Sequence, residues 1–394
     1  KRILIPREWI LKRKQRIIFT RKNKKKMRAI ISGGGTGGHI FPAIAIANAL
    51  KEKYPDAEIL FVGAKGRMEM QKVPQAGYKI IGLPIVGFQR KKFWKNISFP
   101  FKLIYSTIKA KKIVKTFAPD VAIGVGGYAS GPTLAAAVSK HVPALIQEQN
   151  SYPGVTNKML ADSVDTICVA YDNMNRWFDA DKIVFTGNPI RQNISQLYDN
   201  IEEKRAKGFE TFGLNKGKKT VLVIGGSLGA LTINESIFAN LDYFVGNDIQ
   251  LIWQTGKWFY EKAKTRVKGV DSPLIKVYEF IYDMDQAYAL ADVIVSRAGA
   301  IAVSELCIVG KPCILIPSPN VAEDHQTKNA NALVSKNAAL MVKDAEAKER
   351  LIPVIDELMN DDGLRKKLSS NLQSMGIRDA DKRIVEEVEK LVKK

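Results

Sequence analysis

Cysteine is scarce in this chain, with three residues among 394 and no pair in CxxC spacing. All three lie in apolar sequence, which predicts reduced core side chains of a cytosolic protein rather than disulfide bridges. They are Cys168, Cys307 and Cys313. The chain also lacks any uninterrupted apolar run near the length of about 18 residues that a membrane-spanning helix requires. We therefore expect no transmembrane helix.

Histidine is equally scarce, and its three residues lie far apart in the sequence. His141 ends a helix-like stretch and is expected at the surface, whereas His325 lies in a polar loop after a predicted strand and can line a cleft. His39 lies between a glycine-rich segment and a predicted helix. Because none of the three has a closely spaced partner ligand, we expect no protein-bound metal.

Acidic residues are outnumbered, with 40 Asp and Glu against 61 Lys and Arg and a formal net charge of +21. The excess is uneven, because residues 1–26 carry twelve basic residues and one acid, Glu8, which leaves 49 against 39 for the rest. A basic surface suits anionic partners such as phosphates, acidic lipid or nucleic acid. The sequence contains no recognised nucleic-acid-binding motif, so we expect phosphate and lipid contacts and no nucleic acid.

Residues 1–26 form a basic arm that ends where the first strongly patterned segment starts, at Met27. One interpretation is a loose tail or a stretch upstream of the natural start. The alternative is a membrane-binding arm, because Trp9, Ile17 and Phe19 are interleaved with its basic residues. The apolar runs of the arm are too short for a signal peptide, and no small-residue cleavage site follows them.

The length of the chain and its 46% apolar content predict two or three domains rather than one core. From Met27, short β-rich runs alternate with helix-like stretches, which indicates parallel sheets covered by helices on both faces. The pattern restarts near residue 220. We expect two doubly wound α/β domains, 27–190 and 191–370, followed by a segment 371–394 with a charged amphipathic helix. The expected strands are 28–32, 57–62, 121–124, 144–147, 166–169, 220–224, 251–254, 275–278, 293–296 and 313–316, and the first helices of the two halves are 42–53 and 231–241.

Two glycine-rich segments, Gly33–His39 and Gly225–Ala230, each follow a predicted strand and precede a predicted helix. Backbone N–H groups in such loops approach an anion closely, and the helix N-terminus favours negative charge. Ligands of open parallel sheets bind at the carboxyl ends of the strands, so we expect a substrate cleft between the domains. The first loop fits GxGxxG, but no acidic residue ends the second strand, at Phe61-Val62-Gly63, which argues against a nicotinamide cofactor.

Three side chains near these loops are candidates for chemistry. His39, with a pKa near neutrality, can take a proton from an attacking hydroxyl, or it can serve only as a helix-start residue that hydrogen-bonds the loop. Arg191 has the planar fork that suits a diphosphate, or it is a surface residue of the linker 191–217. Glu305 can accept two hydrogen bonds from ribose hydroxyls, or it is an ordinary helix residue.

Taken in order, the motifs of this chain resemble those of the MurG family, the peptidoglycan N-acetylglucosaminyltransferases of glycosyltransferase family 28. The resemblance covers nearly the whole chain from Met27 and leaves out the basic arm. The motifs are GGGTGGHIFP (33–42), GVGGYASGP (124–132), QEQNSYPGVTNK (147–158), GNPIR (187–191), GGSLGA (225–230), FIYDM (280–284), SRAGAIAVSE (296–305) and EDHQTKNA (323–330).

The resemblance implies a GT-B fold, in which two Rossmann-like domains face each other across a cleft and the last helix crosses back to the first domain. It implies an inverting hexosyl transfer from UDP-GlcNAc to the 4-hydroxyl of MurNAc in undecaprenyl-pyrophosphoryl-MurNAc-pentapeptide, the step from lipid I to lipid II in peptidoglycan biosynthesis. The donor binds mainly to the C-terminal domain and the lipid acceptor to the N-terminal domain, with no cofactor bound by the protein. Rival interpretations are a diacylglycerol sugar transferase and a UDP-GlcNAc epimerase, which share the glycine loops or the fold.

By the same resemblance, His39 is the general base, and a set of further positions binds UDP-GlcNAc. Arg191 and Ser227 match diphosphate-binding positions, Ile281 matches a backbone contact to uracil, and Glu305 matches the residue on the ribose hydroxyls. The implied donor-binding residues are Thr36, Gly37, Gly38, Asn150, Arg191, Ser227, Ile281, Ala300, Ile301, Ala302, Val303, Ser304, Glu305 and Gln326.

The sequence departs from the family's pattern at one place. Relatives often carry two adjacent glutamines where this chain has His325-Gln326. Gln326 matches a sugar-binding glutamine, whereas the donor-sugar contact of the first position is left open.

A lipid acceptor implies docking on a membrane, and the segment 84–117 is the candidate surface. It mixes aromatic and basic residues, as segments attracted to an anionic bilayer do. The alternative is an ordinary core helix with a solvated basic face. The resemblance places the protein peripherally on the cytoplasmic face of the inner membrane, beside cell-wall synthesis or division proteins. The docking residues we expect are Phe88, Lys91, Lys92, Phe93 and Trp94.

Overall fold

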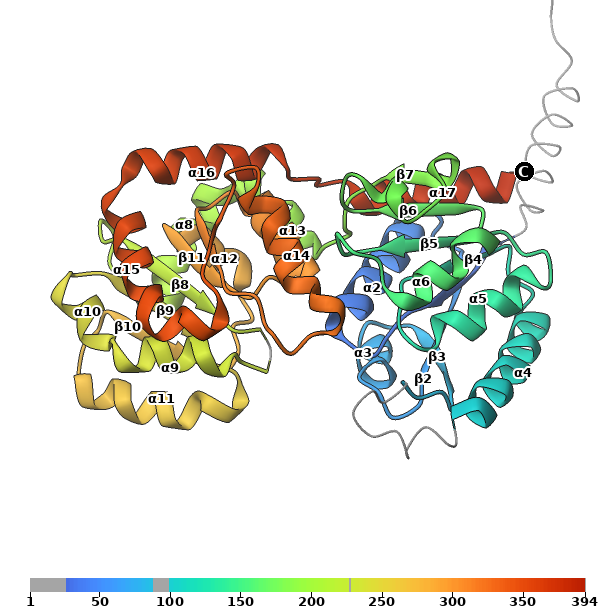
Figure 1. Ribbon diagram of the computed structural model, residues 1–394, viewed down its shortest axis with the longest axis horizontal. Coiled ribbons are helices and arrows are strands. Elements are labelled where there is room, and N and C mark those ends of the chain that lie inside the picture. The colour runs from blue at the N-terminus through green and yellow to red at the C-terminus, as the bar shows by residue number, and fades with distance from the viewer. Residues whose placement is uncertain (1–25, 88–98, 227, 394) are drawn as a thin grey trace, which may run out of the picture.

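Two parallel β-sheets, one in each half of the chain, organise the structure (Figure 1). The computed structural model describes residues 26–87, 99–226 and 228–393. Some of the residues discussed above lie outside the described residues: the basic arm 1–25, the docking candidates Phe88, Lys91, Lys92, Phe93 and Trp94, and the loop residue Ser227.

The N-terminal sheet has seven strands in the order β3-β2-β1-β4-β5-β6-β7, paired in parallel. Its central strands are buried on both faces, which explains why they are continuous apolar runs rather than alternating patterns. The strands are β1 (Arg28–Ser32), β2 (Glu58–Ala64), β3 (Lys79–Leu83), β4 (Val121–Gly124), β5 (Ala144–Glu148), β6 (Thr166–Val169) and β7 (Ile183–Phe185). The helices between them are α2 (Gly37–Lys53), α3 (Glu69–Gln75), α4 (Phe99–Phe117), α5 (Ser130–Val138) and α6 (Val155–Leu160).

The C-terminal sheet has six parallel strands in the order β10-β9-β8-β11-β12-β13. They are β8 (Thr220–Ile224), β9 (Gln250–Gln254), β10 (Ile275–Tyr278), β11 (Val293–Ser296), β12 (Cys313–Leu315) and β13 (Leu340–Met341). The helices are α7 (Gln192–Ser195), α8 (Ile201–Phe212), α9 (Leu231–Ala239), α10 (Leu241–Gly246), α11 (Lys257–Val270), α12 (Met284–Leu290), α13 (Ala300–Val309), α14 (His325–Val334), α15 (Ala347–Asn360), α16 (Asp362–Ser374) and α17 (Ala380–Lys393).

The central strands agree with the sequence prediction, whereas the edges of the sheets do not. The strands expected at 28–32, 121–124, 166–169, 220–224, 275–278 and 293–296 are confirmed to the residue. The edge strands β3, β7 and β13 were not predicted, because they are short and partly exposed and so lack a continuous apolar run. The first helix begins at Gly37 rather than at Pro42, and the helix expected at 231–241 is divided between α9 and α10.

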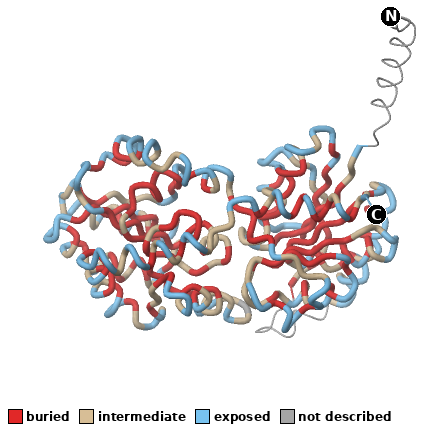
Figure 2. The backbone as a smooth tube through the Cα atoms, turned by 90° about the horizontal axis from the view of Figure 1, so that it is seen from above, coloured by how far each residue is buried: buried red, intermediate tan, exposed pale blue. Residues whose placement is uncertain are grey.

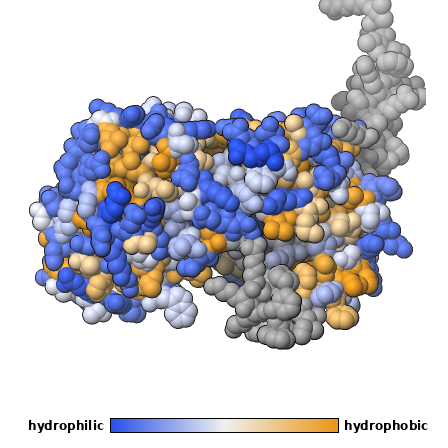
Figure 3. All heavy atoms as spheres, in the orientation of Figure 1, coloured by the Kyte–Doolittle hydropathy of each residue, from blue (hydrophilic) through white to orange (hydrophobic). Residues whose placement is uncertain are grey.

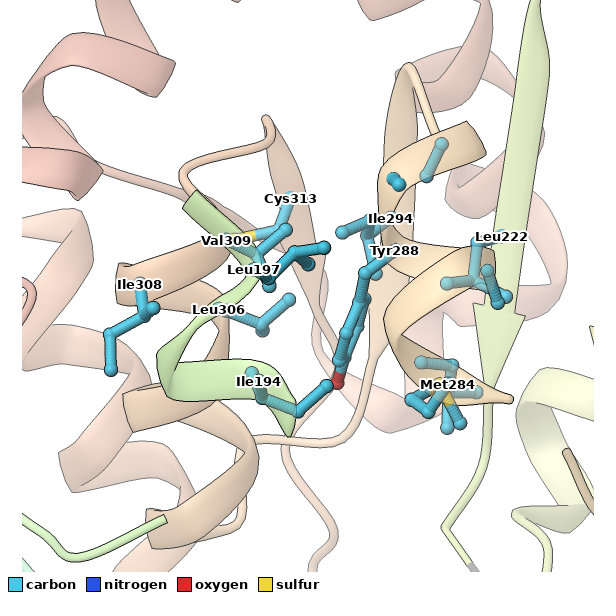
Figure 4. Packing of buried hydrophobic residues seen from close by; sticks show 14 of the residues in the cluster. Ile194, Leu197, Leu222, Met284, Tyr288, Ile294, Leu306, Ile308, Val309 and Cys313 are labelled. Atoms are coloured by element: carbon cyan, nitrogen blue, oxygen red, sulfur yellow. The ribbon is translucent and has the colours of Figure 1, made fainter. Parts of the chain in front are cut away.

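Each domain has a buried core on both faces of its sheet (Figure 2). In the C-terminal domain, the ring of Tyr288 lies between Leu306 and Ile194 on one side and Leu222 and Met284 on the other (Figure 4). The three cysteines are buried and form no disulfide, as the sequence predicted. Within the described ranges, none of the helices combines the length and apolar character needed to cross a bilayer.

The chain passes between the two domains twice, and the second passage ends in α17. This helix lies against α2 of the N-terminal domain (Figure 1). Its apolar stripe, Ile384, Val385, Val388 and Leu391, belongs to the same buried cluster as residues of β1 and α2. The last helix therefore completes the N-terminal core although it follows the whole C-terminal domain in sequence.

Candidate active site

Two glycine-containing loops, one with Gly35 and one with Gly126 and Gly127, pack against each other at the carboxyl ends of the adjacent strands β1 and β4. Gly35, Gly126 and Gly127 have φ values of +87°, +91° and +89°, which favour glycine over any residue with a Cβ. A Cβ on Gly127 would lie 2.4 Å from the carbonyl oxygen of Gly34. The backbones of the two loops thus approach as closely as only glycine allows.

Glu69, the first residue of α3, is a part of this site that the sequence did not reveal. Its side chain is 0% exposed, and its carboxylate accepts hydrogen bonds from the backbone N–H of Ala64 and of Gly35, both at 2.9 Å. The N–H of Gly35 in the glycine loop is therefore bound to a carboxylate of the protein.

His39 lies in the first turn of α2, half-buried beside the glycine loop. Its Nδ1 lies 3.0 Å from the carbonyl oxygen of Gly34, and because a carbonyl only accepts, Nδ1 carries the proton. Nε2 then keeps its lone pair and lies beside Gly126, where an added Cβ would be 2.9 Å away. Burial lowers the pKa of His39, while the Gly34 hydrogen bond and the charges of Glu148 and Glu69 oppose that shift. The predicted bond to the loop is thus present, and it leaves the lone pair on Nε2.

Glu148 at the end of β5 is a second buried carboxylate near His39, with 1% exposure. It accepts hydrogen bonds from the backbone N–H of Asn150 and of Gly154, both at 2.9 Å, and from the side chain of Asn157 at 2.8 Å. Its position within the motif QEQN was a usable signal, but the sequence reasoning assigned only Asn150. Glu148 fixes the loop that presents Asn150.

Asn150 also lies where the two domains touch. Its side-chain oxygen accepts from Asn329 of α14 at 3.2 Å, and the backbone N–H of Ser151 donates to Asn329 at 3.1 Å. Nearby, the Asn188 side chain donates to the Ser304 hydroxyl at 3.0 Å. The loop that carries Asn150 is therefore held by both domains.

Arg191 and Glu305, predicted as separate ligands of the diphosphate and the ribose, are paired with each other. Arg191 donates from Nε to Oε1 at 2.8 Å and from a terminal nitrogen to Oε2 at 2.9 Å. The Tyr288 hydroxyl donates to the same carboxylate at 3.3 Å. Glu305 is 4% exposed. Two of the five N–H groups of Arg191 are therefore used inside the protein, and its side chain is still 38% exposed.

The predicted donor segment 300–305 is divided by the structure. Val303 packs in the hydrophobic core, and the Ser304 hydroxyl accepts a hydrogen bond from Asn188; both residues line a pocket between the domains together with Ser151 and Tyr152. Ala300, Ile301 and Ala302 form the first turn of α13, whose N-terminal N–H groups are the part of the segment suited to an anion.

The remaining predicted residues follow β1, β10 and β12 in the sequence. The backbone N–H of Ile281 donates to the side chain of Gln254 at 2.9 Å, and the Gln326 side chain accepts from the N–H of Ser318 at 2.8 Å. Thr36 is exposed, with its hydroxyl 3.4 Å from Nδ1 of His39. Gly37 and Gly38 form the first turn of α2 with His39.

The two other histidines have different positions. His325, the first residue of α14, is half-buried, and its ring centroid lies 6.0 Å from that of Tyr152 of the N-terminal domain. Burial lowers the pKa of His325, the negative charge of Glu148 opposes that shift, and the positive charge of His39 adds to it. His141 is exposed, as predicted. In the described part of the chain, no three His, Cys, Asp or Glu side chains are grouped so that they could hold a metal ion.

The two Rossmann-like domains, with glycine loops and a histidine at strand ends, have the GT-B fold. Residues 29–169 match the Glycosyltransferase family 28 N-terminal domain, and residues 220–384 match the Glycosyltransferase family 28 C-terminal domain. The chain belongs to glycosyltransferase family 28.

Individual relatives narrow this class. The UDP-N-acetylglucosamine--N-acetylmuramyl-(pentapeptide) pyrophosphoryl-undecaprenol N-acetylglucosamine transferase of Parabacteroides distasonis is 54% identical over 94% of this chain and 100% of its own length. The protein of the same name from Cytophaga hutchinsonii is 58% identical over 94% of this chain and 98% of its own length. The crystal structure of Acinetobacter baumannii MurG superimposes with a TM-score of 0.74 at 26% identity, covering 92% of this chain and 99% of that one. The predicted fold and MurG-family membership are thereby confirmed.

Proposed function

We propose that this chain transfers N-acetylglucosamine from UDP-GlcNAc to the 4-hydroxyl of the muramyl sugar in a lipid-linked muramyl-pentapeptide diphosphate. The observation that carries the proposal is the state of His39, whose Nδ1 is bound to Gly34 while Nε2 is available beside two glycine loops. The names of the relatives that are 54% and 58% identical state this donor and this acceptor.

The base in this reaction is Nε2 of His39. It takes the proton of the acceptor hydroxyl while that oxygen attacks the anomeric carbon of GlcNAc from the face opposite UDP. The bond from the anomeric carbon to the UDP oxygen breaks, and UDP leaves with the electron pair. The new bond is a β1→4 linkage formed with inversion, because one displacement occurs. A positioned general base contributes about a hundred- to ten-thousandfold to such a step.

The donor side of the cleft supplies positive potential for the leaving diphosphate. The first-turn N–H groups of α13 at Ala300, Ile301 and Ala302 act on charge that develops in the transition state. When the donor binds, Arg191 turns to the diphosphate and Glu305 turns to the ribose hydroxyls. The two hydrogen bonds between these residues, of 2.8 and 2.9 Å, are then replaced by hydrogen bonds to the donor.

A transfer assay tests the reaction. The protein is incubated with UDP-GlcNAc and a short-chain lipid diphosphate of muramyl pentapeptide, and the product is analysed by mass and by NMR of the new linkage. We expect a β1→4 disaccharide with release of UDP. Conversion of UDP-GlcNAc to free UDP-ManNAc without disaccharide would contradict the transferase and support the epimerase alternative.

For the lipid acceptor we propose docking through α4, on the cytoplasmic face of the membrane. One stripe of this helix is buried in the protein, whereas Phe101, Ile104, Tyr105 and Ile108 are between 59% and 74% exposed. Their spacing of three and four residues places them on one face of the helix. Figure 3 shows apolar surface over α4. An exposed apolar stripe with nearby lysines is the composition that binds anionic bilayers.

A further inference from the structure

One peptide group joins a buried carboxylate to the proposed base. The N–H of Gly35 donates to Oε2 of Glu69 at 2.9 Å. The carbonyl of the same peptide group, on Gly34, accepts from Nδ1 of His39 at 3.0 Å. We propose that Glu69 is a positioning residue that acts on His39 through the Gly34–Gly35 peptide group, fixing the Nδ1–H tautomer and raising the basicity of Nε2.

The position of Glu69 supports a role beyond packing. The side chain is 0% exposed, and each carboxylate oxygen is held by a backbone N–H, from Ala64 and Gly35. Among the ion pairs of the described residues, none includes Glu69. A buried carboxylate without a cation is costly, and an uncharged residue would fill the same volume at lower cost. The charge is thus directed at the peptide group that it binds.

The glycines around Glu69 fit this arrangement. A Cβ on Gly34 would lie 2.3 Å from both Cδ and Oε1 of Glu69, and a Cβ on Gly63 would lie 2.6 Å from its Cγ. Glycine at position 34 therefore admits the carboxylate next to the peptide group, in addition to any close approach of a ligand to the loop.

The physical effect follows from polarisation along the chain of hydrogen bonds. A carboxylate that accepts from the Gly35 N–H shifts electron density toward the Gly34 oxygen, and hydrogen bonds in series strengthen one another. A stronger acceptor at Gly34 favours a proton on Nδ1 and stabilises the imidazolium that forms during the reaction. No proton crosses the peptide group.

Other charged groups face His39 and act alongside Glu69. Glu148, from β5, raises the pKa of His39 as Glu69 does, whereas desolvation acts against both. His325, from α14, interacts unfavourably with His39 when both are protonated. A test must therefore change Glu69 while Glu148 and His325 stay in place.

Histidine NMR is well suited to this test, because the chain has only three histidines and few signals must be distinguished. In the unmodified protein, the ¹⁵N shifts of neutral His39 should report the Nδ1–H tautomer. In Glu69→Gln, the amide can accept one of the two N–H groups but carries no charge, so the pKa of His39 should fall. The matched control is Glu58→Gln, which removes a half-exposed carboxylate of β2 that pairs with Arg28 at 3.3 Å.

Enzyme kinetics provide the second readout. This part of the test rests on the proposed function, whereas the NMR part does not. In Glu69→Gln, the acidic limb of kcat/KM should move to lower pH and turnover should fall by roughly tenfold to a hundredfold, with KM for UDP-GlcNAc unchanged. An unchanged His39 pKa in folded Glu69→Gln would overturn the proposal. If that variant does not fold, an Nε2–H tautomer in the unmodified protein would overturn it equally. A chain with the predicted tautomer and pKa shift but no transfer activity would refute the proposed function alone.

Discussion

At the residue scale, His39 combines a fixed orientation with a pKa moved by opposing effects. Burial is the largest effect and lowers the pKa, and the neutral imidazole is the form that acts as base. We therefore predict that the acidic limb of kcat/KM has its midpoint below about 6.5, the ordinary histidine value. A pH–rate profile with the short-chain acceptor measures this midpoint, and a value above about 7 would contradict the description of this environment.

The same shift has a consequence for stability. A histidine whose pKa is lower in the folded state binds a proton more readily when unfolded, so its contribution to stability is present above the unfolded pKa. That contribution is lost as the pH falls from the unfolded pKa toward the lowered folded one. Mild acid thus lowers both the fraction of His39 that is neutral and the stability of the folded state.

The sequence revealed single residues of the site but not their partners. His39, Arg191 and Glu305 were identified because their motifs are contiguous or lie at domain junctions. Glu69 is separated from Gly35 by 34 positions and lies at a helix start with no local pattern to mark its role. The pairing of Arg191 with Glu305 joins residues 114 positions apart, and such distances are set by the fold rather than by the local sequence.

At the scale of elements, the glycine loop Gly33–Gly35 is hydrogen-bonded to both His39 and Glu69. We predict that Gly34→Ala lowers turnover and destabilises the protein by about 1–3 kcal/mol, because the new methyl overlaps a carboxylate that two hydrogen bonds hold in place. Thermal unfolding and the transfer assay measure the two effects. Gly131→Ala is the matched control, since its nearest neighbour would be 3.6 Å away within a helix. Equal behaviour of the two variants would argue that the loop adapts.

The α4 helix gives a second prediction at this scale. The double variant Ile104→Glu with Ile108→Glu should weaken binding to vesicles that contain anionic lipid, because it places charge in the exposed apolar stripe. Its transfer activity with a soluble short-chain acceptor should stay near normal. Met159→Glu is the control, since Met159 is 77% exposed on α6. Flotation of vesicles measures binding, and unchanged flotation of the double variant would remove α4 as the docking surface.

The elements that the sequence predicted best are those buried on both faces. β1, β4 and β8 appear as short apolar runs between glycines and polar residues, so their bounds could be identified. β7 and β13 have half-buried residues and short lengths, and their pairing depends on the neighbouring strand. Edge strands therefore need the assembled sheet to be recognised.

At the scale of the whole molecule, α17 ties the end of the chain to the N-terminal core. We predict that Ile384→Ala destabilises the protein by about 2–5 kcal/mol, the range for removal of a buried aliphatic side chain, because Ile384 is 0% exposed beneath α2. Glu386→Ala, on the exposed face of the same helix, should leave stability nearly unchanged. Denaturant unfolding measures both, and equal stabilities would mean that α17 does not support the core.

The two domains also meet at the site itself, where Asn329 of one domain contacts Asn150 and Ser151 of the other. The proposed base belongs to the N-terminal domain, and the paired Arg191 and Glu305 lie on the proposed donor side. Only the assembled molecule brings acceptor chemistry and donor chemistry together.

The most direct measurement is the rate of β1→4 disaccharide formation by the unmodified protein and by His39→Gln, with UDP-GlcNAc affinity determined for both. We predict that the unmodified chain forms the disaccharide and that His39→Gln slows turnover by about a hundredfold or more, with nearly unchanged donor affinity. A folded His39→Gln variant with near-normal turnover, or an unmodified chain that forms no disaccharide, would contradict this prediction.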